Sequence, residues 1–259
     1  MFFVEIYEPV ARIILANPKR RNALSLQVMQ ELTAALRELG NNQNVGAIVI
    51  ASEGSAFSAG HDLAEMVDRS AGFYTQLFGA CTELMQTIHN VPQPVIAEVA
   101  GVATAAGCQL VAACDLAVAS AQATFATPGV RIGLFCSTPM VPISRAVGRK
   151  RAMQMLLTGE AISATTAAEW GLVNRVVEPQ ELRSATDELT AKITCFSSDT
   201  IARGKQAFYR QLDCGEPEAY ELTGAVMAAN AASDDAQEGM DAFLAKRPPA
   251  WSKPSSERH

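Results

Sequence analysis

The feature that most constrains the fold is an alternation of short β-branched runs with longer helical patterns along the first half of the chain. Strand-like runs occur at Phe3–Tyr7, Val10–Leu15, Val45–Ala51, Val95–Ala100 and Leu116–Ala119. Helical spacing of apolar residues separates them at Leu26–Leu39, Phe73–His89 and Ala103–Ala113, with Ser25 as the expected N-cap of the first helix. Strands separated by helices are typical of a parallel α/β fold.

The second half of the chain has a different texture. From Arg149 onward the periodicity is almost entirely helical, apart from one strand-like stretch at Leu172–Val177. Amphipathic helices are expected over Glu181–Thr194 and Ile201–Gln211. We therefore predict an α/β core over residues 1–195, followed by a C-terminal helical region over residues 196–259.

Composition excludes several classes of protein. The chain has 259 residues, of which 49% are hydrophobic and 19% charged, and its net charge of −6 gives no general basic field for nucleic acid. No apolar run is long enough to span a membrane, and the first ten residues do not resemble a signal peptide. The six cysteines form no CxxC pair, and the three histidines show no metal-ligand spacing. These observations predict a cytoplasmic protein with reduced thiols, no metal and no membrane span.

Familiar catalytic motifs are missing. The chain has no GxxxxGK[ST] loop, no GxGxxG after a strand and no HExxH. The nearest approach to a nucleophile elbow, Ala56–Gly60, has alanine in place of the first glycine. Nucleotide triphosphate, dinucleotide and zinc chemistry are therefore not expected.

Two small-residue loops, Phe57–Leu63 and Gly101–Cys108, each follow an apolar strand. In parallel α/β sheets ligands collect beyond the carboxyl ends of strands, and small residues there let a ligand oxygen approach the backbone. The second loop also opens a helix, whose free N–H groups favour negative charge. The loops are therefore candidates for binding an oxyanion. The alternative is that Ala103–Gly107 is small only so that its helix can pack tightly.

At these loops, and in eight other segments, the chain resembles the crotonase (enoyl-CoA hydratase/isomerase) superfamily. The matching segments run in the family's order over nearly the whole chain: Asn17-Pro18, Arg21–Leu24, Phe57–Leu63, Ala106–Cys108, Cys114-Asp115, Phe125–Pro128, Leu157–Ala164, Trp170–Val173, Glu238–Met240 and Phe243–Arg247. The resemblance implies an α/β spiral of ββα repeats whose C-terminal helical region makes a homotrimer or a dimer of trimers. It also implies an acyl-CoA thioester as ligand, with coenzyme A as part of the substrate and no separate cofactor.

Site residues follow from the resemblance position by position. The backbone N–H groups of His61 and Ala106 would form the oxyanion hole for the thioester carbonyl. The residues implied to bind coenzyme A are Arg20, Arg21, Ala23, Ala59, His61, Asp62, Leu63, Phe243 and Lys246. For Arg20 and Arg21 the alternative is an ordinary solvated turn.

The chain departs from the family where hydration chemistry would sit. Hydratases of the family use two glutamates, and this chain has Gln109 and Gly129 at those positions. An amide positions water but does not exchange a proton near neutral pH, so efficient hydration is in doubt. Candidate catalytic side chains are those of His61, Gln109 and Cys136, although Cys136 is better explained as a buried structural thiol. Glu65 is better explained as the start of a helix.

Three functions therefore stay open. The resemblance favours an enoyl-CoA hydratase/isomerase-type enzyme that acts on a fatty or organic acyl-CoA. The missing glutamates leave two alternatives on the same fold: an acyl-CoA thioesterase or decarboxylase, or a non-catalytic acyl-CoA-binding protein.

Overall fold

A six-stranded sheet forms the centre of the molecule. The computed structural model describes residues 1–252. The strand order is β1 (Phe2–Tyr7), β2 (Val10–Leu15), β3 (Ala47–Ser52), β5 (Val95–Val99), β7 (Leu116–Ser120) and β10 (Arg175–Val177). Within this six-stranded sheet, only the β1–β2 pair is antiparallel. Each strand-like run of the sequence is confirmed as a strand, with ends shifted by a few residues.

A second, smaller sheet was not predicted from the sequence. Its order is β4 (Ala56–Ser58), β6 (Val102–Thr104), β8 (Thr124–Ala126) and β9 (Ile162–Ser163). Strands of two or three residues are too short to show a period, so sequence patterns do not reveal them. For the same reason the helix expected from Ala103 is partly wrong: residue 103 lies in β6, and the helix begins at Ala106.

The chain passes between the two sheets as a spiral. β3, β5 and β7 of the large sheet are each followed by a strand of the small sheet, and then by helical structure: α2 (Leu63–Met66) and α3 (Ala71–Asn90), α4 (Ala106–Ala113), or η2 (Pro128–Ile132) and α5 (Met140–Val147). The remaining elements of this part are η1 (Pro18–Arg20), α1 (Leu26–Asn41), α6 (Arg149–Thr158), α7 (Ala164–Trp170), η3 (Pro179–Glu181) and α8 (Leu182–Thr194). This topology is a spiral of ββα repeats.

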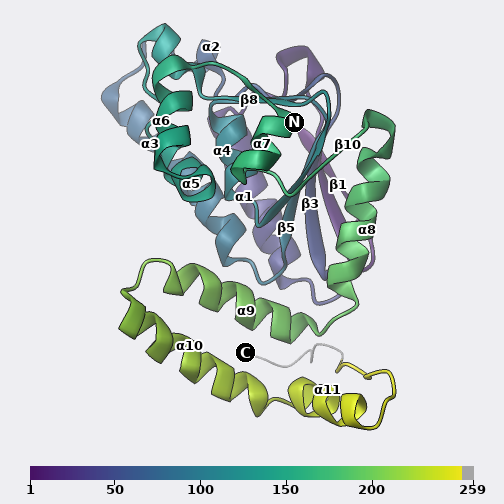
Figure 1. The fold of residues 1–259 in the computed structure, drawn as a ribbon. Helices are drawn as coiled ribbons and strands as arrows, with labels where there is room; N and C mark the ends of the chain where they lie inside the picture. Colours follow the sequence, from purple (N-terminus) through teal and green to yellow (C-terminus); the bar gives the residue numbers. More distant parts are fainter. Residues whose placement is uncertain (253–259) are drawn as a thin grey trace.

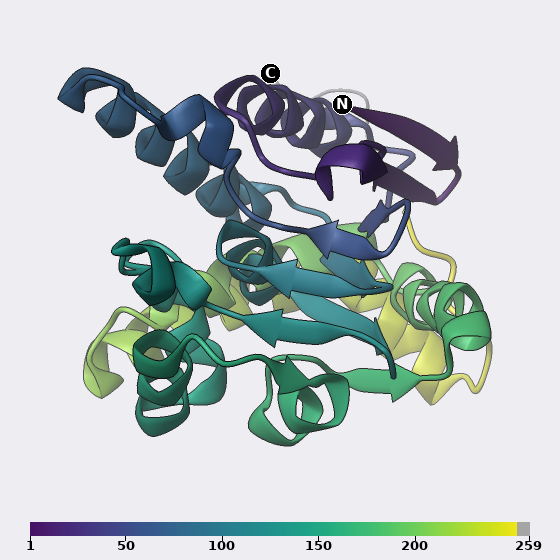
Figure 2. The same cartoon turned by 90° about the horizontal axis from the view of Figure 1, so that it is seen from above.

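Both faces of the large sheet are covered by helices (Figures 1 and 2). Ile48 and Ile50 on β3 belong to the main core with residues of α1, α3 and α4. Their neighbours Ala47 and Val49 form a separate cluster with Leu189 and Ile193, the latter two on α8. Alternate residues of a strand point to opposite faces, so the continuous apolar run of β3 reflects burial on both sides. The predicted Ser25 cap is confirmed, since its side chain accepts a hydrogen bond from the Val28 N–H.

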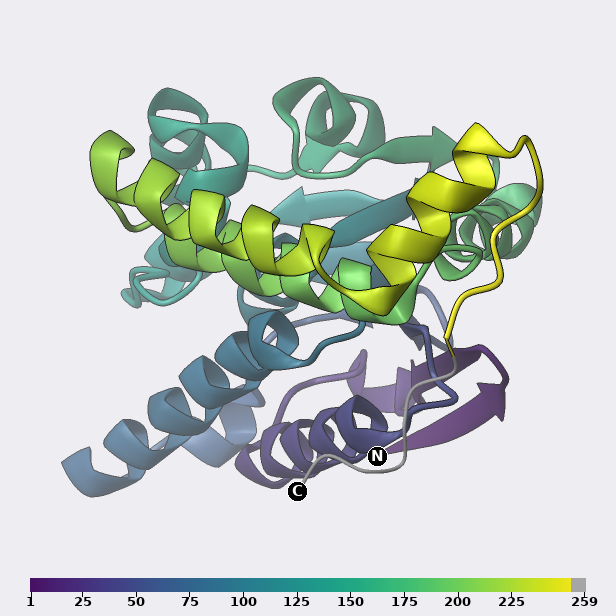
Figure 3. The ribbon, with the colours of Figure 1, turned by 90° about the horizontal axis from the view of Figure 1, so that it is seen from below.

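Three C-terminal helices lie across one end of this core. α9 (Ser198–Gln211) contacts α3, and α10 (Glu216–Ala231) and α11 (Asp234–Leu244) pack on α9 (Figures 1 and 3). No residue of α10 is buried, and Tyr220, Met227 and Phe243 are at least 70% exposed. Such exposed apolar surface is characteristic of an interaction face. The boundary at residues 195 and 196 stays a prediction.

A buried ion pair attaches α9 to the core. The Lys205 Nζ lies 2.7 Å from Asp115 Oδ2 and also donates to the carbonyl oxygens of Ile88 and Gln93. The Tyr209 hydroxyl donates to Asp115 Oδ1 at 2.6 Å. The Asp115 carboxylate thus holds α9 against the core.

Replacing Lys205 by methionine should lower the free energy of unfolding by about 2 kcal/mol. The substitution leaves the Asp115 carboxylate half-buried without its cation, although its other hydrogen bonds remain. Chemical denaturation of Lys205→Met tests this, with Lys150→Met in exposed α6 as the matched control. Equal stability of the two variants would show that the ion pair does not contribute.

A pocket with two free backbone donors

The loop at residues 17–24 is fastened to the loop that follows β4. The buried Asn22 donates from Nδ2 to the carbonyl oxygens of Glu53 and Ala56, and accepts from the Asn17 N–H. The Ser58 hydroxyl donates to the Asn22 carbonyl oxygen at 2.9 Å. These contacts hold the loop at residues 17–24 against the loop after β4, although the two loops are far apart in sequence.

His61 has an N–H group that faces away from this fastening. Leu24 and His61 form a parallel bridge, in which the Leu24 N–H donates to Gly60 O at 2.8 Å and the Asp62 N–H donates to Leu24 O at 3.3 Å. In such a bridge the amide of the middle residue points to the opposite side. Within residues 1–252 the His61 N–H donates to no acceptor.

The second donor comes from the first residue of α4. Ala106 begins this helix, and its N–H has no acceptor within the described chain, as expected at a helix N-terminus. The two donors are close neighbours, because a Cβ built on Gly60 would lie 3.0 Å from the Ala106 nitrogen. Gly60 has φ +87°, which glycine alone adopts readily. Glycine thus lets the two loops meet.

The residue before Ala106 is strained. Ala105 has φ 50° and ψ −119°, a conformation that costs a residue with a Cβ on the order of 1–3 kcal/mol. Its N–H donates to the Ala126 carbonyl oxygen at 2.9 Å, and Thr104 Oγ1 donates to Ala59 O at 3.1 Å, so both neighbouring loops hold it in place. This conformation sets the direction of the following Ala106 N–H. This strain is not predictable from the sequence, since alanine does not mark positive φ.

Both donors border a cavity of about 420 Å³. Its walls come from the loop after β4, the start of α4, α3, η2 and the segment before α5. The lining residues are Ala59, His61, Leu63, Met66, Phe78, Ala105, Ala106, Pro128, Gly129, Arg131, Ile132, Leu134, Phe135, Cys136, Ser137, Thr138 and Pro139. The structure therefore brings together four predicted positions in particular: His61, Ala106, Gly129 and Cys136.

Gln109 does not join them. It is buried in α4, is not a lining residue, and its Oε1 lies 3.6 Å from the Cys81 thiol of α3. The side chain is thus directed at the interface of two helices. Sequence position alone could not show which way an amide in the second turn of the helix would point.

Gly129 leaves no room for a side chain. A Cβ at this position would lie 2.0 Å from Leu134 O and 2.8 Å from Cys136 Sγ. The backbone and thiol of the segment after η2 occupy the space where a carboxylate would begin. The shape of this pocket therefore excludes a glutamate at position 129.

The Cys136 thiol is a poor nucleophile in this setting. Burial raises its pKa, and the opposing effect of the Gly129 backbone is weaker. No cation or exposed helix end stabilises the thiolate among the described contacts. These contacts favour the structural explanation of Cys136.

The His61 imidazole is neutral at physiological pH. Burial lowers its pKa, and the Leu24 backbone and the Glu65 carboxylate only oppose this effect. The ring packs edge-on against Phe78 at 5.4 Å between centroids, and neither ring nitrogen has a hydrogen-bond partner within the described residues. Glu65 itself lies in α2, as expected, and accepts from the Leu26 N–H at 3.0 Å. His61 lines the cavity, but both of its ring nitrogens are buried, and the lowered pKa makes the imidazole a weaker base than a free one.

Acid should destabilise the protein partly through His61. Its pKa is lowered in the folded state, so between that pKa and about 6.5 the unfolded chain binds more protons and stability falls as pH falls. The slope from this one group is at most about 1.4 kcal/mol per pH unit. Chemical denaturation from pH 7 to pH 5 should therefore show a shallower loss for His61→Gln. His89, whose pKa burial also lowers, still titrates in both proteins. Identical slopes would contradict the buried neutral state of His61.

A second hollow adjoins the first across the segment at residues 59–65. It measures about 470 Å³, and Arg20, Ala23, Asp62 and Arg69 are among its lining residues. Arg20 forms an ion pair with Asp62 at 3.0 Å, whereas the neighbouring Arg21 is exposed and not a lining residue. Ala59, His61 and Leu63 face the first cavity while Asp62 faces the second.

Phe243 and Lys246 lie elsewhere. Both are exposed at the end of α11, which Figure 1 shows at the opposite end of the molecule from α2. Neither lines the two hollows. Within one chain the structure does not bring them to the predicted site.

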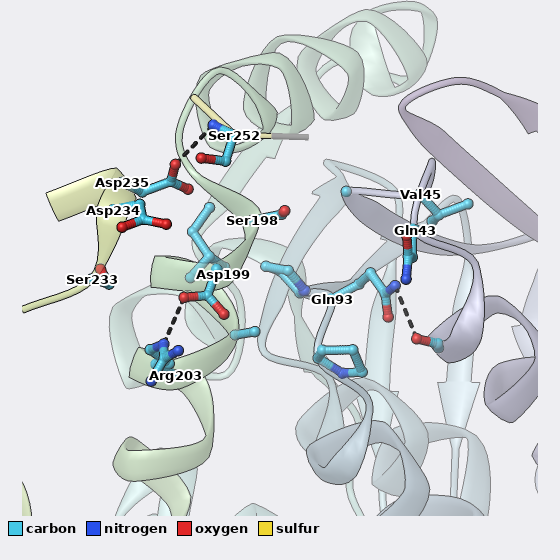
Figure 4. Close-up of a pocket in the computed structure, with 16 residues that line it drawn as sticks. Gln43, Val45, Gln93, Ser198, Asp199, Arg203, Ser233, Asp234, Asp235 and Ser252 are labelled. Atoms are coloured by element: carbon cyan, nitrogen blue, oxygen red, sulfur yellow. Dashed lines mark hydrogen bonds and ion pairs between the residues drawn. The ribbon is translucent and has the colours of Figure 1, made fainter. Parts of the chain in front are cut away.

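Another cavity, of about 490 Å³, separates the core from the C-terminal helices (Figure 4). Two of its three acidic residues are engaged: Asp199 contacts Arg203 Nε at 2.6 Å, and Asp235 accepts from the Ser252 N–H at 2.7 Å. No residue of the predicted site lines it. Among the described residues no group of three His, Cys, Asp or Glu side chains is arranged to hold a metal, and no helix is long and apolar enough to cross a membrane.

Solved structures match the overall fold. An enoyl-CoA hydratase of Mycobacterium smegmatis superposes with a TM-score of 0.95 at 46% identity, covering 96% of this chain and 98% of that one. The human enoyl-CoA hydratase domain-containing protein 3 gives a TM-score of 0.94 at 45% identity, covering 96% and 99%. The fold is that of the crotonase superfamily, as the sequence predicted.

Sequence comparisons narrow the class to a family. A family model described as enoyl-CoA hydratase/isomerase matches residues 5–254. The mitochondrial enoyl-CoA hydratase domain-containing protein 3 of Xenopus laevis is 48% identical, over 93% of this chain and 83% of its own length. A probable enoyl-CoA hydratase of Rhizobium meliloti is 35% identical over 94% of this chain and 95% of its own length. The chain belongs to the enoyl-CoA hydratase/isomerase family.

One expectation is corrected by these names. The frog, mouse and human relatives are all described as mitochondrial. The cytoplasmic location predicted from the sequence is therefore wrong by this comparison, which points to mitochondria. The prediction rested on the absence of a recognisable leader, and such an absence is weak ground for a location.

Proposed function

We propose that the chain is an enzyme that binds an acyl-CoA thioester with its carbonyl oxygen between the His61 and Ala106 N–H groups. The observation that carries the proposal is the pair of unpartnered N–H groups beside one cavity, with the strained Ala105 directing one of them. Such fixed donors stabilise negative charge that develops on an oxygen during reaction. The acyl group then occupies the cavity, and coenzyme A extends along the hollow that Arg20 and Asp62 line.

The position of the carbonyl can be tested by infrared spectroscopy. With a thioester labelled with ¹³C at the carbonyl, the stretching band should move to lower frequency on binding, because two N–H donors polarise the bond. A variant that lacks one donor, Ala106→Pro, should show a smaller shift. An unshifted band in the saturated wild-type complex would show that the carbonyl oxygen does not bind between the His61 and Ala106 N–H groups.

We further propose that catalysis does not rely on a pair of carboxylates. Hydration needs one group to activate water and another to deliver a proton. No Asp or Glu is among the residues that line the cavity in the described chain, Gln109 is turned away, and Gly129 has no space for a side chain. His61 is the group left to exchange a proton near neutral pH.

This pocket favours reactions that form an oxyanion without two carboxylates. In thioester hydrolysis, water gives up a proton as it adds to the carbonyl carbon, and the tetrahedral oxyanion collapses with loss of the CoA thiolate, which takes up a proton. In decarboxylation of a malonyl-type thioester, the bond to the carboxylate breaks, its electrons form the enolate, and the α-carbon takes up a proton. Both place negative charge on the oxygen that the two N–H groups would hold.

The exposed apolar face of the C-terminal helices supports assembly as a homotrimer or a dimer of trimers. Tyr220, Met227 and Phe243 are exposed to an extent that is unusual for apolar residues of a monomer. In such an assembly Phe243 and Lys246 would approach the coenzyme A of a neighbouring copy. Sedimentation at three or six times the 27.6 kDa chain mass is the expected result, and a monomer would refute it.

A further inference from the structure

Arg131 is a cation without a partner beside an otherwise apolar cavity. It lies in η2 and is the only Lys or Arg among the residues that line the cavity in the described part of the chain. No Asp or Glu between residues 1 and 252 lies within ion-pair distance of it, and its guanidinium makes no hydrogen bond there.

The Arg131 side chain is held over a glycine. Gly159 ends α6 with φ +61°, and a Cβ built on it would lie 3.2 Å from Arg131 Nε and 3.1 Å from the Pro128 Cα. The stem of the arginine therefore lies in the space that this glycine leaves open. This contact places Arg131 Nε beside Gly159 at the edge of the cavity, while the arginine as a whole is exposed.

Arg131 belongs to the acyl side of the pocket. The segment at residues 59–65 separates the two hollows, and Arg20 and Arg69 line the one proposed for coenzyme A. Arg131 comes from η2 in the other hollow, together with Leu134 and Phe135. A phosphate of coenzyme A is therefore not the anion that this guanidinium would meet.

We propose that Arg131 recognises a carboxylate on the acyl group, so that the preferred ligands are CoA thioesters of dicarboxylic acids. This inference rests on the proposed function and specifies its substrate class. The guanidinium presents a planar set of donors that matches a carboxylate. Its apolar neighbours Leu134, Phe135 and Pro139 cover the methylene groups between the thioester and the carboxylate. The absence of acidic lining residues leaves the ligand to supply the negative charge.

A matched pair of ligands tests the inference. Butyryl-CoA and succinyl-CoA have acyl chains of equal length and differ by a methyl against a carboxylate at the end. Their dethia analogues, with a methylene in place of the thioester sulfur, prevent turnover during calorimetric titration. Succinyl-dethia-CoA should bind about tenfold more tightly, as expected for one charge-assisted hydrogen-bonded pair.

Variants assign the preference to Arg131. Arg131→Gln should lower the affinity for succinyl-dethia-CoA about tenfold more than the affinity for butyryl-dethia-CoA, while Arg131→Lys should retain part of the preference. Arg149→Gln, on exposed α6 and outside the lining, is the control and should keep the full preference. Equal affinities of the wild type for the two analogues, or an equal loss for both in Arg131→Gln, would overturn the assignment. If neither analogue binds, the proposed function itself fails.

Discussion

Replacing Ala106 by proline should lower the turnover of an acyl-CoA substrate by about a hundredfold or more. The loss of one oxyanion-hole donor typically has an effect of this size. Ala106 is the first residue of α4, so its N–H makes no hydrogen bond within the helix. The residue before a proline prefers extended backbone, whereas Ala105 has φ 50° and ψ −119°, so the fold of this variant is measured alongside its turnover. The substitution thus removes a donor without removing a helical hydrogen bond. Steady-state kinetics on the converted thioester measure the effect.

The control for this variant is Ala71→Pro. Ala71 is the first residue of α3, is exposed, follows a residue with extended backbone at Ser70, and does not line the cavity. Its turnover should match the wild type. If Ala106→Pro folds, as judged by circular dichroism and thermal unfolding, and keeps the wild-type rate, the N–H of Ala106 is not a catalytic donor.

Restoring a glutamate at position 129 should fail. The first side-chain atom would lie 2.0 Å from Leu134 O, so the segment at residues 134–136 must move and a carboxylate must be placed against a buried thiol. Overpacking and charge burial together should lower the free energy of unfolding by about 3 kcal/mol or more. Gly129→Glu should therefore be destabilised and gain no hydratase activity.

Gly79→Glu is the matched substitution for this experiment. Gly79 lies on α3, is exposed, and has no atom within 4 Å of a built Cβ. Its stability should change little, because glutamate is also a good helix former. A stable Gly129→Glu protein that hydrates an enoyl-CoA would show that the segment after η2 yields to a carboxylate, and that the pocket is a hydratase site lacking one residue.

The large sheet and its helices were predictable because their signals are long. β3 begins with five consecutive apolar residues, and α1 repeats its apolar residues over sixteen positions after a serine cap. The small sheet was not predictable, because β6 is three residues that continue into the pattern of α4. Its existence depends on contacts between β4, β6 and β8, which are far apart along the chain.

The site was predictable in part for a similar reason. The small-residue loops that carry the His61 and Ala106 N–H groups match segments of the crotonase superfamily. That resemblance implied that the two N–H groups lie close together. Three features depend on neighbouring parts of the chain, which no local pattern encodes. They are the strain at Ala105, the orientation of Gln109 toward α3 and the lack of space at Gly129. Arg131 was missed because a single arginine in a loop is unremarkable until a cavity without carboxylates surrounds it.

The most direct test of the central claim is mass spectrometry of CoA thioesters after incubation with the protein in ¹⁸O-labelled water. The panel should contain enoyl-, malonyl-type and saturated acyl-CoA. We expect that free CoA is released, or that carbon dioxide is lost from the malonyl-type thioester, and that the rate of either reaction falls in Ala106→Pro. Rapid gain of ¹⁸O on an intact enoyl thioester would contradict a mechanism without paired carboxylates, and no reaction of any thioester would contradict catalysis.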